Sequence, residues 1–421
     1  MKNQLLHTPE GVRDIYNHEC AVKLELEKRL HQVIRSHGYQ DIQTPTFEFF
    51  DIFNKERGSV VSNEMFKFID REGNTLVLRP DLTPSIARCA SKYFMTEDMP
   101  LRFCYTGNTY INNHSYQGRL KETTQMGCEL IGDETTDAAG EMIAIIIKCM
   151  LAAGLTKFQV ELGEVGFFNG LLEDANFDEE TEAELREYIE NKNYFGMEEM
   201  LLQKGVTEDL RNRFLALSNL FGSVDCLKEA RTITTNTTSL EAILRLEKIY
   251  RILECYGLEQ YVSFELGMLG HYKYYTGILF RGYTYGTGEA VVTGGRYNSL
   301  LQQFGKESAA IGFAIHVDQL MLALTRQKIR IDTVYTDCLV LFEHKERQAG
   351  IVLSECFRKQ GKLVEQTRRR TRYQISDYIS YARREKIGNI YYIEDREKVV
   401  WIVMEKESEQ VLTLEELIRG E

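Results

Sequence analysis

The segment TTQMGCELIG, residues 123–132, has the pattern of a β-strand with an unusual polar face. Side chains alternate along a strand, so Gln125, Gly127 and Glu129 share one face. That face combines an amide, a carboxylate and a gap between them. Two interpretations follow from these residues alone: the face meets water at a sheet edge, or it lines a pocket for a small, positively charged ligand.

Regular strand and helix patterns surround this segment on both sides. Apolar spacing predicts helices over residues 17–38, 83–93, 137–153, 297–304 and 316–326. Alternation predicts strands in 39–53 (broken at Pro45), 100–111, 123–132, 158–165, 262–269, 273–286 and 288–295, and a hairpin over 65–80. The chain thus mixes many strands with helices, as an α+β protein does.

The pattern of strand and helix signals in the sequence changes at two points, and these changes predict the domain organisation. Residues 166–257 are acidic and leucine-rich at helical spacing, so we expect a helical insertion there. After residue 330 short strands and helices alternate over some ninety residues, the pattern of a small α/β domain. We therefore expect one domain at 1–330, containing the insertion, and a second at 331–421.

Composition limits the classes of function. The formal net charge of −12 argues against a large nucleic-acid footprint, since phosphate binding needs a basic surface. The nine cysteines are scattered without a CxxC pair, which favours reduced thiols over disulfides or a zinc site, so we expect no metal. The N-terminus lacks the apolar core of a signal peptide and no apolar run is long enough to span a bilayer. We expect a cytoplasmic protein.

Two further stretches could contribute to a site, although each has an ordinary structural explanation. LRPDLTP (78–84) places Asp81 and Thr83 where a strand gives way to a helix, and such residues commonly cap helices. YKYYTGILF and VVTGGRYNSLL supply Tyr275 and Tyr297, but tyrosines beside strands are usually half-buried packing. Taken singly, none of these stretches indicates a ligand.

In combination and in this order, the stretches resemble histidyl-tRNA synthetases across roughly residues 5–330. TPEGVRDIY is similar to the entry segment of that family, LRPDLTPSIAR to its arginine-proline-acid-x-threonine element, and GRLKETTQMGCELIG to the end of class II motif 2. YKYYTGILF is similar to its histidine-binding tyrosine strand and TGGRYNSLLQQFG to the run into motif 3. The resemblance implies a class II synthetase-like antiparallel sheet with flanking helices. The C-terminal domain resembles a shortened anticodon-binding domain more loosely.

The resemblance also implies which residues would bind histidine. The matching positions are Asp81, Thr83, Gln125, Glu129, Tyr275 and Tyr297. Glu129 and Asp81 would meet the α-ammonium group, Gly127 would leave room for the ligand, and the tyrosines would hold the imidazole. The arginines that would face the ligand carboxylate are missing, and Arg119 and Lys273 are our candidates to replace them.

The positions at which this sequence departs from the family are positions that the family uses for adenylation. Ile111, Gly270 and Gln319 stand where a synthetase has arginines, and Lys273 stands where it has an aspartate. Each lost contact to a phosphate or oxyanion costs on the order of 2–4 kcal/mol in the transition state. Three such losses predict that aminoacylation is absent and that this chain is not an enzyme.

A synthetase-like chain that retains the amino-acid site resembles the regulatory subunits of ATP phosphoribosyltransferase. This resemblance implies a short catalytic subunit as partner, histidine as inhibitory effector, and a homodimer within a hetero-oligomer, with no cofactor. The pair would catalyse the first step of histidine biosynthesis. Two alternatives stay open: a divergent histidyl-tRNA synthetase, favoured by the basic run at 368–372, and a free-standing histidine sensor.

Overall fold

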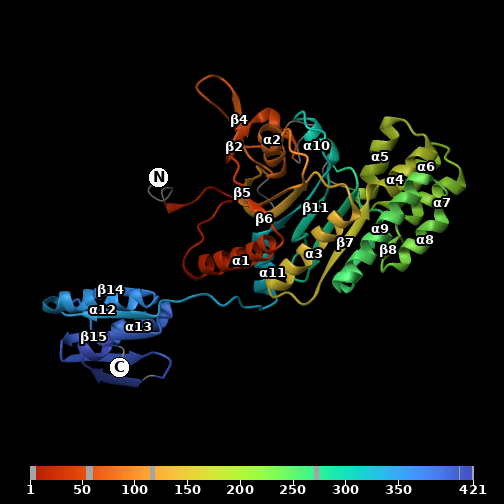
Figure 1. The fold of residues 1–421 in the computed structure, drawn as a ribbon. Helices are drawn as coiled ribbons and strands as arrows, with labels where there is room; N and C mark the ends of the chain where they lie inside the picture. Colours follow the sequence, from red (N-terminus) through yellow and green to blue (C-terminus); the bar gives the residue numbers. More distant parts are fainter. Residues whose placement is uncertain (1–5, 54–59, 114–118, 270–274, 407, 420–421) are drawn as a thin grey trace. The chain divides into compact units, whose positions relative to one another are not determined.

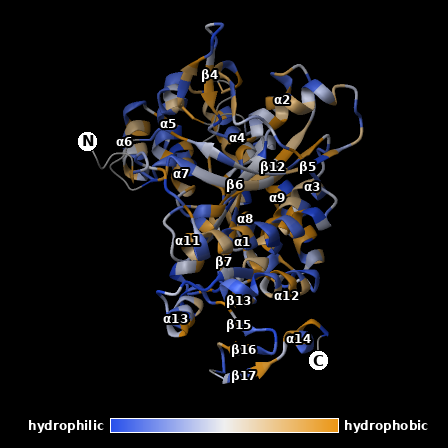
Figure 2. Cartoon of the chain, turned by 90° about the vertical axis from the view of Figure 1, so that its left-hand side faces the viewer, coloured by the Kyte–Doolittle hydropathy of each residue, from blue (hydrophilic) through white to orange (hydrophobic). Residues whose placement is uncertain are grey.

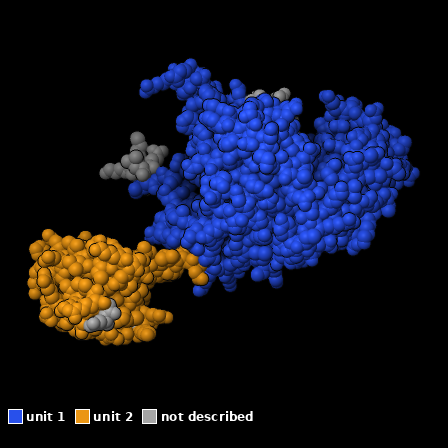
Figure 3. Space-filling view, in the orientation of Figure 1, with its two compact units in different colours: residues 1–331 blue, residues 332–421 orange. Residues whose placement is uncertain are grey.

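The computed structural model describes residues 6–53, 60–113, 119–269, 275–406 and 408–419 (Figure 1). The chain divides into two compact units, which are unit 1 at Met1–Ile331 and unit 2 at Asp332–Glu421 (Figure 3). Each unit has its own sheet and its own hydrophobic core. Among the described helices, none has the length and apolar character needed to cross a membrane.

A nine-stranded sheet forms the centre of unit 1, in the order β1-β5-β6-β12-β11-β10-β7-β9-β8. Its strands are β1 (Gln40–Asp41), β5 (Leu101–Tyr110), β6 (Glu122–Ile131), β7 (Phe158–Glu164), β8 (Phe221–Gly222), β9 (Val262–Glu265), β10 (Ile278–Thr284), β11 (Val292–Arg296) and β12 (Ala310–His316). All neighbours pair antiparallel except β1 with β5 and β7 with β9. This mainly antiparallel sheet with flanking helices confirms the predicted α+β class.

One face of this sheet packs into the main hydrophobic core, and the opposite face carries the polar residues of β6. The helices against it are α1 (Asn17–Ser36), α2 (Thr83–Tyr93), α3 (Thr136–Ala152), α10 (Asn298–Gln302) and α11 (Val317–Arg326). Met126, Cys128 and Leu130 of β6 belong to the main core, together with buried residues of α1 and α3. Because side chains alternate, Gln125 and Glu129 point to the opposite face, where α2 and α10 lie (Figure 1).

A small sheet, β2-β4-β3, leads into α2. Its strands are β2 (Phe47–Phe49), β3 (Lys67–Ile69) and β4 (Thr75–Leu78), and β4 is largely hydrophobic (Figure 2). The buried Arg79 follows β4 and donates hydrogen bonds to the main-chain oxygens of Asn108 at 2.9 Å and Thr44 at 2.8 Å. Arg79 thereby holds the start of α2 against β5. Its role is structural, because its guanidinium group contacts main-chain carbonyl groups.

Helices connect two neighbouring strands of the main sheet. The chain leaves β7, forms α4 (Val165–Ala175), α5 (Glu179–Glu190), α6 (Tyr194–Gln203), α7 (Glu208–Ala216), α8 (Asp225–Ile233) and α9 (Thr237–Tyr256), and returns in β9. Asn236 caps α9 by accepting from the amides of Thr238 and Ser239, and Gly257 ends it with φ of 67°. α9 packs against α3, where Gly140 makes room for Ile252.

Unit 2 contains a five-stranded sheet in the order β14-β13-β15-β16-β17. Its elements are β13 (Cys338–Phe342), α12 (Arg347–Lys359), β14 (Val364–Arg368), α13 (Ile375–Glu385), β15 (Asn389–Asp395), β16 (Lys398–Val403), β17 (Ser408–Leu412) and α14 (Leu414–Arg419). β13 pairs parallel with both β14 and β15, whereas β16 and β17 are antiparallel. Apolar clusters cover both faces of the sheet.

Among the strands and α-helices, β8, β12, β17 and α14 have no counterpart in the sequence predictions, and β8 lies within the expected helical insertion. β12 reads AIGFAIH, and its small residues give little of the polar–apolar alternation that marks a strand. It is nevertheless a central strand, paired with β6 and β11. β12 forms part of the candidate pocket, so the sequence pattern left that part of the pocket undetected.

Candidate functional site

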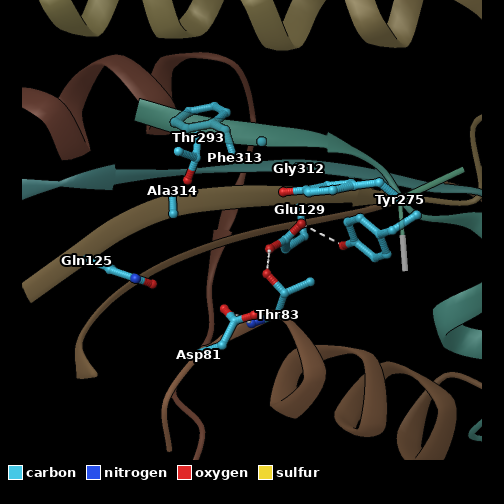
Figure 4. Close-up of a pocket in the computed structure, with 11 residues that line it drawn as sticks. Asp81, Thr83, Gln125, Glu129, Tyr275, Thr293, Gly312, Phe313 and Ala314 are labelled. Carbon is cyan, nitrogen blue, oxygen red and sulfur yellow. Dashed lines mark hydrogen bonds between the residues drawn. The ribbon is translucent and has the colours of Figure 1, made fainter. Parts of the chain in front are cut away.

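A pocket opens on the face of the main sheet that carries Gln125 and Glu129 (Figure 4). Its lining residues are Asp81, Thr83, Gln125, Glu129, Tyr275, Thr293, Gly294, Tyr297, Gly312, Phe313 and Ala314. It contains about 330 Å³ of empty space, a volume that includes its open mouth. The sequence-predicted residues converge here from β6, the start of α2 and the segments around β11, with the exception of Arg119.

The carboxyl group of Glu129 is the centre of the pocket. Glu129 is only 1% exposed, and its oxygens accept hydrogen bonds from the Tyr297 hydroxyl at 2.5 Å and the Thr83 hydroxyl at 2.8 Å. Gly312 is its direct partner on β12, and a Cβ atom there would lie 1.6 Å from Glu129 Oε2. The absence of a side chain at residue 312 therefore makes the space that Glu129 occupies.

Burial raises the pKa of Glu129 to about 8. The hydrogen bonds from Tyr297 and Thr83 stabilise the ionised form and lower this pKa, whereas the nearby carboxylate of Asp81 raises it further. Near neutral pH the carboxyl of the empty pocket is therefore mostly protonated. A cationic group placed beside it would restore the charged form, because an opposite charge within a few ångströms favours ionisation.

We expect an α-ammonium ligand such as histidine to release up to about one proton from the protein on binding near neutral pH. Glu129 is mostly protonated in the protein without ligand, and a positive charge beside it would favour its ionised form. Calorimetric titrations in buffers of different ionisation enthalpy measure this release.

The Glu129→Gln variant is the control for this measurement, since it has no proton to lose and should show a smaller release. Binding heats of the wild type that do not depend on the buffer would contradict the assignment of Glu129 to the ammonium group.

Asp81 and Thr83 serve both the helix and the pocket. The carboxylate of Asp81 accepts a hydrogen bond from the amide of Thr83, the first residue of α2, at 3.2 Å, although the N-cap residue itself is Leu82 and has no side-chain cap bond. Both side chains also line the pocket, and the Thr83 hydroxyl binds Glu129. Asp81 thus satisfies one free amide at the start of α2, as the helix-capping interpretation expected, whereas the Thr83 side chain is used in the pocket and not as a cap.

Gln125 contributes a polar atom with no partner among the described residues. Its side-chain oxygen is buried and accepts no hydrogen bond, although buried polar groups are nearly always satisfied. Gln125 lies four residues before Glu129 on the same face of β6, with Gly127 between them, and lines the same pocket. An unsatisfied amide oxygen in a pocket fits a ligand that brings a donor.

Two tyrosines form the side of the pocket nearest α10. Tyr297 is buried and donates its hydroxyl to Glu129. The half-buried Tyr275 lines the same pocket (Figure 4) and packs against the cluster that contains Tyr297. An aromatic ring combined with a hydroxyl suits a ligand with a flat, partly polar group. The sequence resemblance predicts an imidazole at this side of the pocket.

Arg119 lies apart from the pocket lining. Its side chain is 57% exposed and forms an ion pair with Glu289 at 2.8 Å, and Glu289 also accepts a hydrogen bond from Gln319 at 3.2 Å. Among the described lining residues there is no lysine or arginine to meet a ligand carboxylate. Our other candidate, Lys273, and the altered position Gly270 lie outside the described residues.

The gap at Gly127 has a different cause from the one we inferred from sequence. A Cβ atom at this position would lie 1.8 Å from the Phe313 carbonyl oxygen and 2.8 Å from the Tyr105 hydroxyl. Tyr105 donates its hydroxyl to that same carbonyl at 3.2 Å. Gly127 therefore lets β12 approach β6, and the expectation that it leaves room for the ligand was wrong.

Sequence reasoning missed the contribution of β11 and β12. The lining residues that it did not identify are Thr293, Gly294, Gly312, Phe313 and Ala314. Thr293 also pairs with His316, whose Nε2 lies 3.1 Å from the threonine hydroxyl oxygen. The glycine within AIGFAIH was the available signal, since glycine inside a strand often marks a close approach.

Two of the positions that lack synthetase arginines are engaged in other contacts. The amide of Ile111, just beyond β5, donates to the Lys121 carbonyl at 2.9 Å. Gln319 on α11 reaches Glu289, and its neighbour Asp318 accepts a hydrogen bond from the Thr124 amide at 2.6 Å. Neither position supplies the fixed positive charge that bidentate phosphate binding requires.

The fold and much of the sequence match known proteins. The family model for histidyl-tRNA synthetase matches residues 11–320. An ATP phosphoribosyltransferase regulatory subunit from Acetivibrio thermocellus is 38% identical over 415 residues, which cover 99% of this chain and 99% of that protein.

Solved structures agree with this match. A protein from Bacillus halodurans, described as an ATP phosphoribosyltransferase regulatory subunit/histidyl-tRNA synthetase, has a TM-score of 0.83 and 32% identity, covering 92% of this chain and 98% of its own. Histidyl-tRNA synthetase from Nostoc sp. PCC 7120 has a TM-score of 0.81 at 18% identity, covering 99% of both chains, and so shares the fold.

These matches confirm the predicted class II synthetase-like fold and extend over nearly the whole chain. The sequence relatives are named as regulatory subunits, in agreement with the altered arginine positions. The chain therefore belongs to the ATP phosphoribosyltransferase regulatory subunits, a family built on the histidyl-tRNA synthetase fold.

Proposed function

We propose that this chain activates a short ATP phosphoribosyltransferase catalytic subunit and lets histidine inhibit the assembled enzyme. Together the two subunits would join ATP and phosphoribosyl pyrophosphate in the first step of histidine biosynthesis, in the cytoplasm. One observation carries the proposal: the pocket retains a buried carboxyl group with hydroxyl donors around it, while arginines are missing at Ile111 and Gln319.

Histidine is the ligand that this pocket suits best. Its α-ammonium group would lie against Glu129 and Asp81, and its imidazole against Tyr275 and Tyr297. Gln125 would accept a hydrogen bond with its unsatisfied oxygen. The described lining is acidic and contains no basic side chain, which favours recognition through the ammonium group and the ring.

The synthetase chemistry is lost in this proposal. Transfer of histidine to ATP needs positive charges that stay on the phosphates, and neither isoleucine nor glutamine can supply them. The basic run 368–372 offers little support for RNA binding. Arg369 already pairs with Glu343 at 2.7 Å and lies over the ring of Tyr392.

Self-association accompanies this function. β2 and β3 expose Phe47, Phe49 and Phe68, which the register of the small sheet places on one face. An exposed cluster of this kind is typical of a protein interface. We assign it to a homodimer within the larger complex, and we assign residues 331–421 to a shortened anticodon-binding-like domain.

We expect the catalytic subunit from the same genome to be nearly inactive alone and active when this chain is added. Pyrophosphate release from ATP and phosphoribosyl pyrophosphate, followed with and without this chain, measures the effect. Histidine should then inhibit the reconstituted pair. Full activity of the catalytic subunit alone would contradict the proposal.

The same preparation separates the alternatives. Histidine-dependent ATP–pyrophosphate exchange by this chain, clearly above a control without protein, would favour a divergent synthetase. Histidine binding without a complex with any short phosphoribosyltransferase would favour a free-standing sensor. A matched negative control is an amino acid without an imidazole ring, such as alanine, which should not inhibit the pair.

A further inference from the structure

Three potential metal ligands meet on the face of the main sheet opposite the pocket. They are His31 on α1, Asp41 on β1 and Cys104 on β5. The parallel register of β1 and β5 places Asp41 directly beside Cys104, and α1 packs over them. Among the described residues, this is the one group of three such side chains whose ligand atoms converge.

The distances between these atoms are close to those in a metal site. His31 Nε2 lies 2.6 Å from Asp41 Oδ1, and Cys104 Sγ lies 3.4 Å from the same oxygen. All three ligand atoms lie within 4.8 Å of one another. Ligand atoms around a tetrahedral zinc ion are roughly 3–4 Å apart, given bonds of about 2.0–2.3 Å, so small side-chain adjustments would suffice.

We infer that His31, Asp41 and Cys104 bind a divalent cation that favours nitrogen and sulfur ligands, such as Zn²⁺. An imidazole, a carboxylate and a thiolate are a donor set typical of zinc, and three protein ligands leave a fourth position for water. On binding, the thiol of Cys104 loses its proton to solvent, and the proton on His31 Nε2 leaves through solvent, so that the neutral ring carries its one proton on Nδ1. The hydrogen bond between His31 and Asp41 is replaced by metal bonds from His31 Nε2, Asp41 Oδ1 and Cys104 Sγ. No electron is transferred.

The burial of the three ligands suits such a site. Cys104 is only 1% exposed and is anchored in the core, whereas the side chains of His31 and Asp41 are 39% and 58% exposed. The ion can therefore enter from solvent. Arg35 lies 3.7 Å from the second oxygen of Asp41 and also donates to the Tyr39 carbonyl, so the carboxylate would stay oriented while Oδ1 binds metal.

The spacing of these residues explains why sequence analysis predicted no metal. The ligands come from positions 31, 41 and 104, and cysteine spacing alone cannot detect a site with a single cysteine. Sheet pairing brings two of the ligands together and helix packing brings the third. A bound ion would tie α1 to the edge of the sheet.

Cobalt titration of the full-length protein, first freed of metal with a chelator, tests this inference. We expect one equivalent of Co²⁺ to produce a thiolate-to-cobalt charge-transfer band together with the visible bands of a four-coordinate ion, and Zn²⁺ to displace it. Cys104→Ser should abolish the charge-transfer band. His31→Gln should weaken binding by at least about tenfold.

Controls keep the test informative. Cys255 is exposed and could bind cobalt by itself, so its contribution must be tested separately. Because we assign the band to Cys104, Cys255→Ser should leave the spectrum unchanged. His31→Gln changes a partly exposed side chain and should fold even if the buried Cys104→Ser does not. The inference is overturned if the wild type shows no stoichiometric band, or if the band survives both Cys104→Ser and His31→Gln.

Discussion

Replacing Glu129 by glutamine is expected to weaken histidine binding by roughly ten- to hundredfold. Glutamine has nearly the same size and can still contact Tyr297 and Thr83, but it cannot carry the charge that would meet an α-ammonium group. A charge-assisted hydrogen bond contributes about 1.5–3 kcal/mol, which corresponds to this loss of affinity. Calorimetric titration of both proteins with histidine measures the difference.

The pH dependence of this loss makes the test specific. Below the pKa of about 8, the wild-type carboxyl must first lose its proton, at a free-energy cost that the glutamine variant does not have. The ratio of the two affinities should therefore increase as pH rises toward 8. The ligand's own titration cancels in this ratio, because both proteins bind the same histidine.

A second glutamate on β6 provides the matched control. Glu122 lies outside the pocket lining and accepts hydrogen bonds from Asn108 and Tyr110, so Glu122→Gln removes one charge from the same strand. It should leave histidine affinity unchanged. Equal affinities of wild type and Glu129→Gln at every pH would mean that Glu129 does not meet the ligand.

In the reconstituted complex, Glu129→Gln should separate two functions. We assign activation to assembly with the catalytic subunit and inhibition to the pocket, so we expect the variant complex to be active and to respond to histidine only at higher concentration. Inhibition curves of the two complexes measure this shift. A variant that fails to activate its partner would place Glu129 in the assembly instead.

Replacing Gly312 by alanine is expected to destabilise the protein by about 1–3 kcal/mol and to abolish measurable histidine binding. The new methyl group would lie 1.6 Å from Glu129 Oε2 and 2.7 Å from the Cys128 carbonyl oxygen. The carboxylate can move only by giving up its hydrogen bonds to Tyr297 and Thr83. Denaturant unfolding and calorimetry measure the two effects.

Two further variants show whether the clash is the cause. Gly288→Ala adds a methyl group where no atom lies within 4 Å and should leave stability and binding unchanged. Combining Gly312→Ala with Glu129→Ala should recover part of the lost stability, because the clashing side chain is gone, without restoring binding. A Gly312→Ala protein that binds histidine normally would contradict this description of the pocket.

The sequence predicted the pocket residues on strands with strong polar–apolar alternation. It missed the pocket residues on strands where this alternation is weak. In β6 the polar residues Gln125 and Glu129 alternate with apolar ones, so both their common face and their proximity could be inferred. They are buried, so the interpretation as a water-facing edge does not hold. In β12 the apolar residues are nearly continuous and a glycine interrupts them, so no strand was predicted.

Contacts between distant segments were beyond sequence reasoning. The pairing of Gly312 with Glu129 depends on sheet register, which no local pattern specifies. Arg119 is a second example: it was a candidate to face the ligand carboxylate, whereas its ion-pair partner in the structure is Glu289, which is distant in sequence. The six residues inferred from family motifs do line one pocket, because those motifs encode spatial neighbours.

The connection between β7 and β9 has a consequence for how this protein can evolve. The long helical segment α4–α9 leaves the sheet at the end of β7 and re-enters at the start of the adjacent parallel strand β9, so it is a crossover between the opposite ends of two neighbouring strands. A crossover between parallel strands needs only a dozen or so residues, far fewer than are present. Lineages could therefore shorten, extend or replace these helices while the strands of the pocket keep their register. The helical segment can therefore change its sequence and its binding partners independently of the pocket strands.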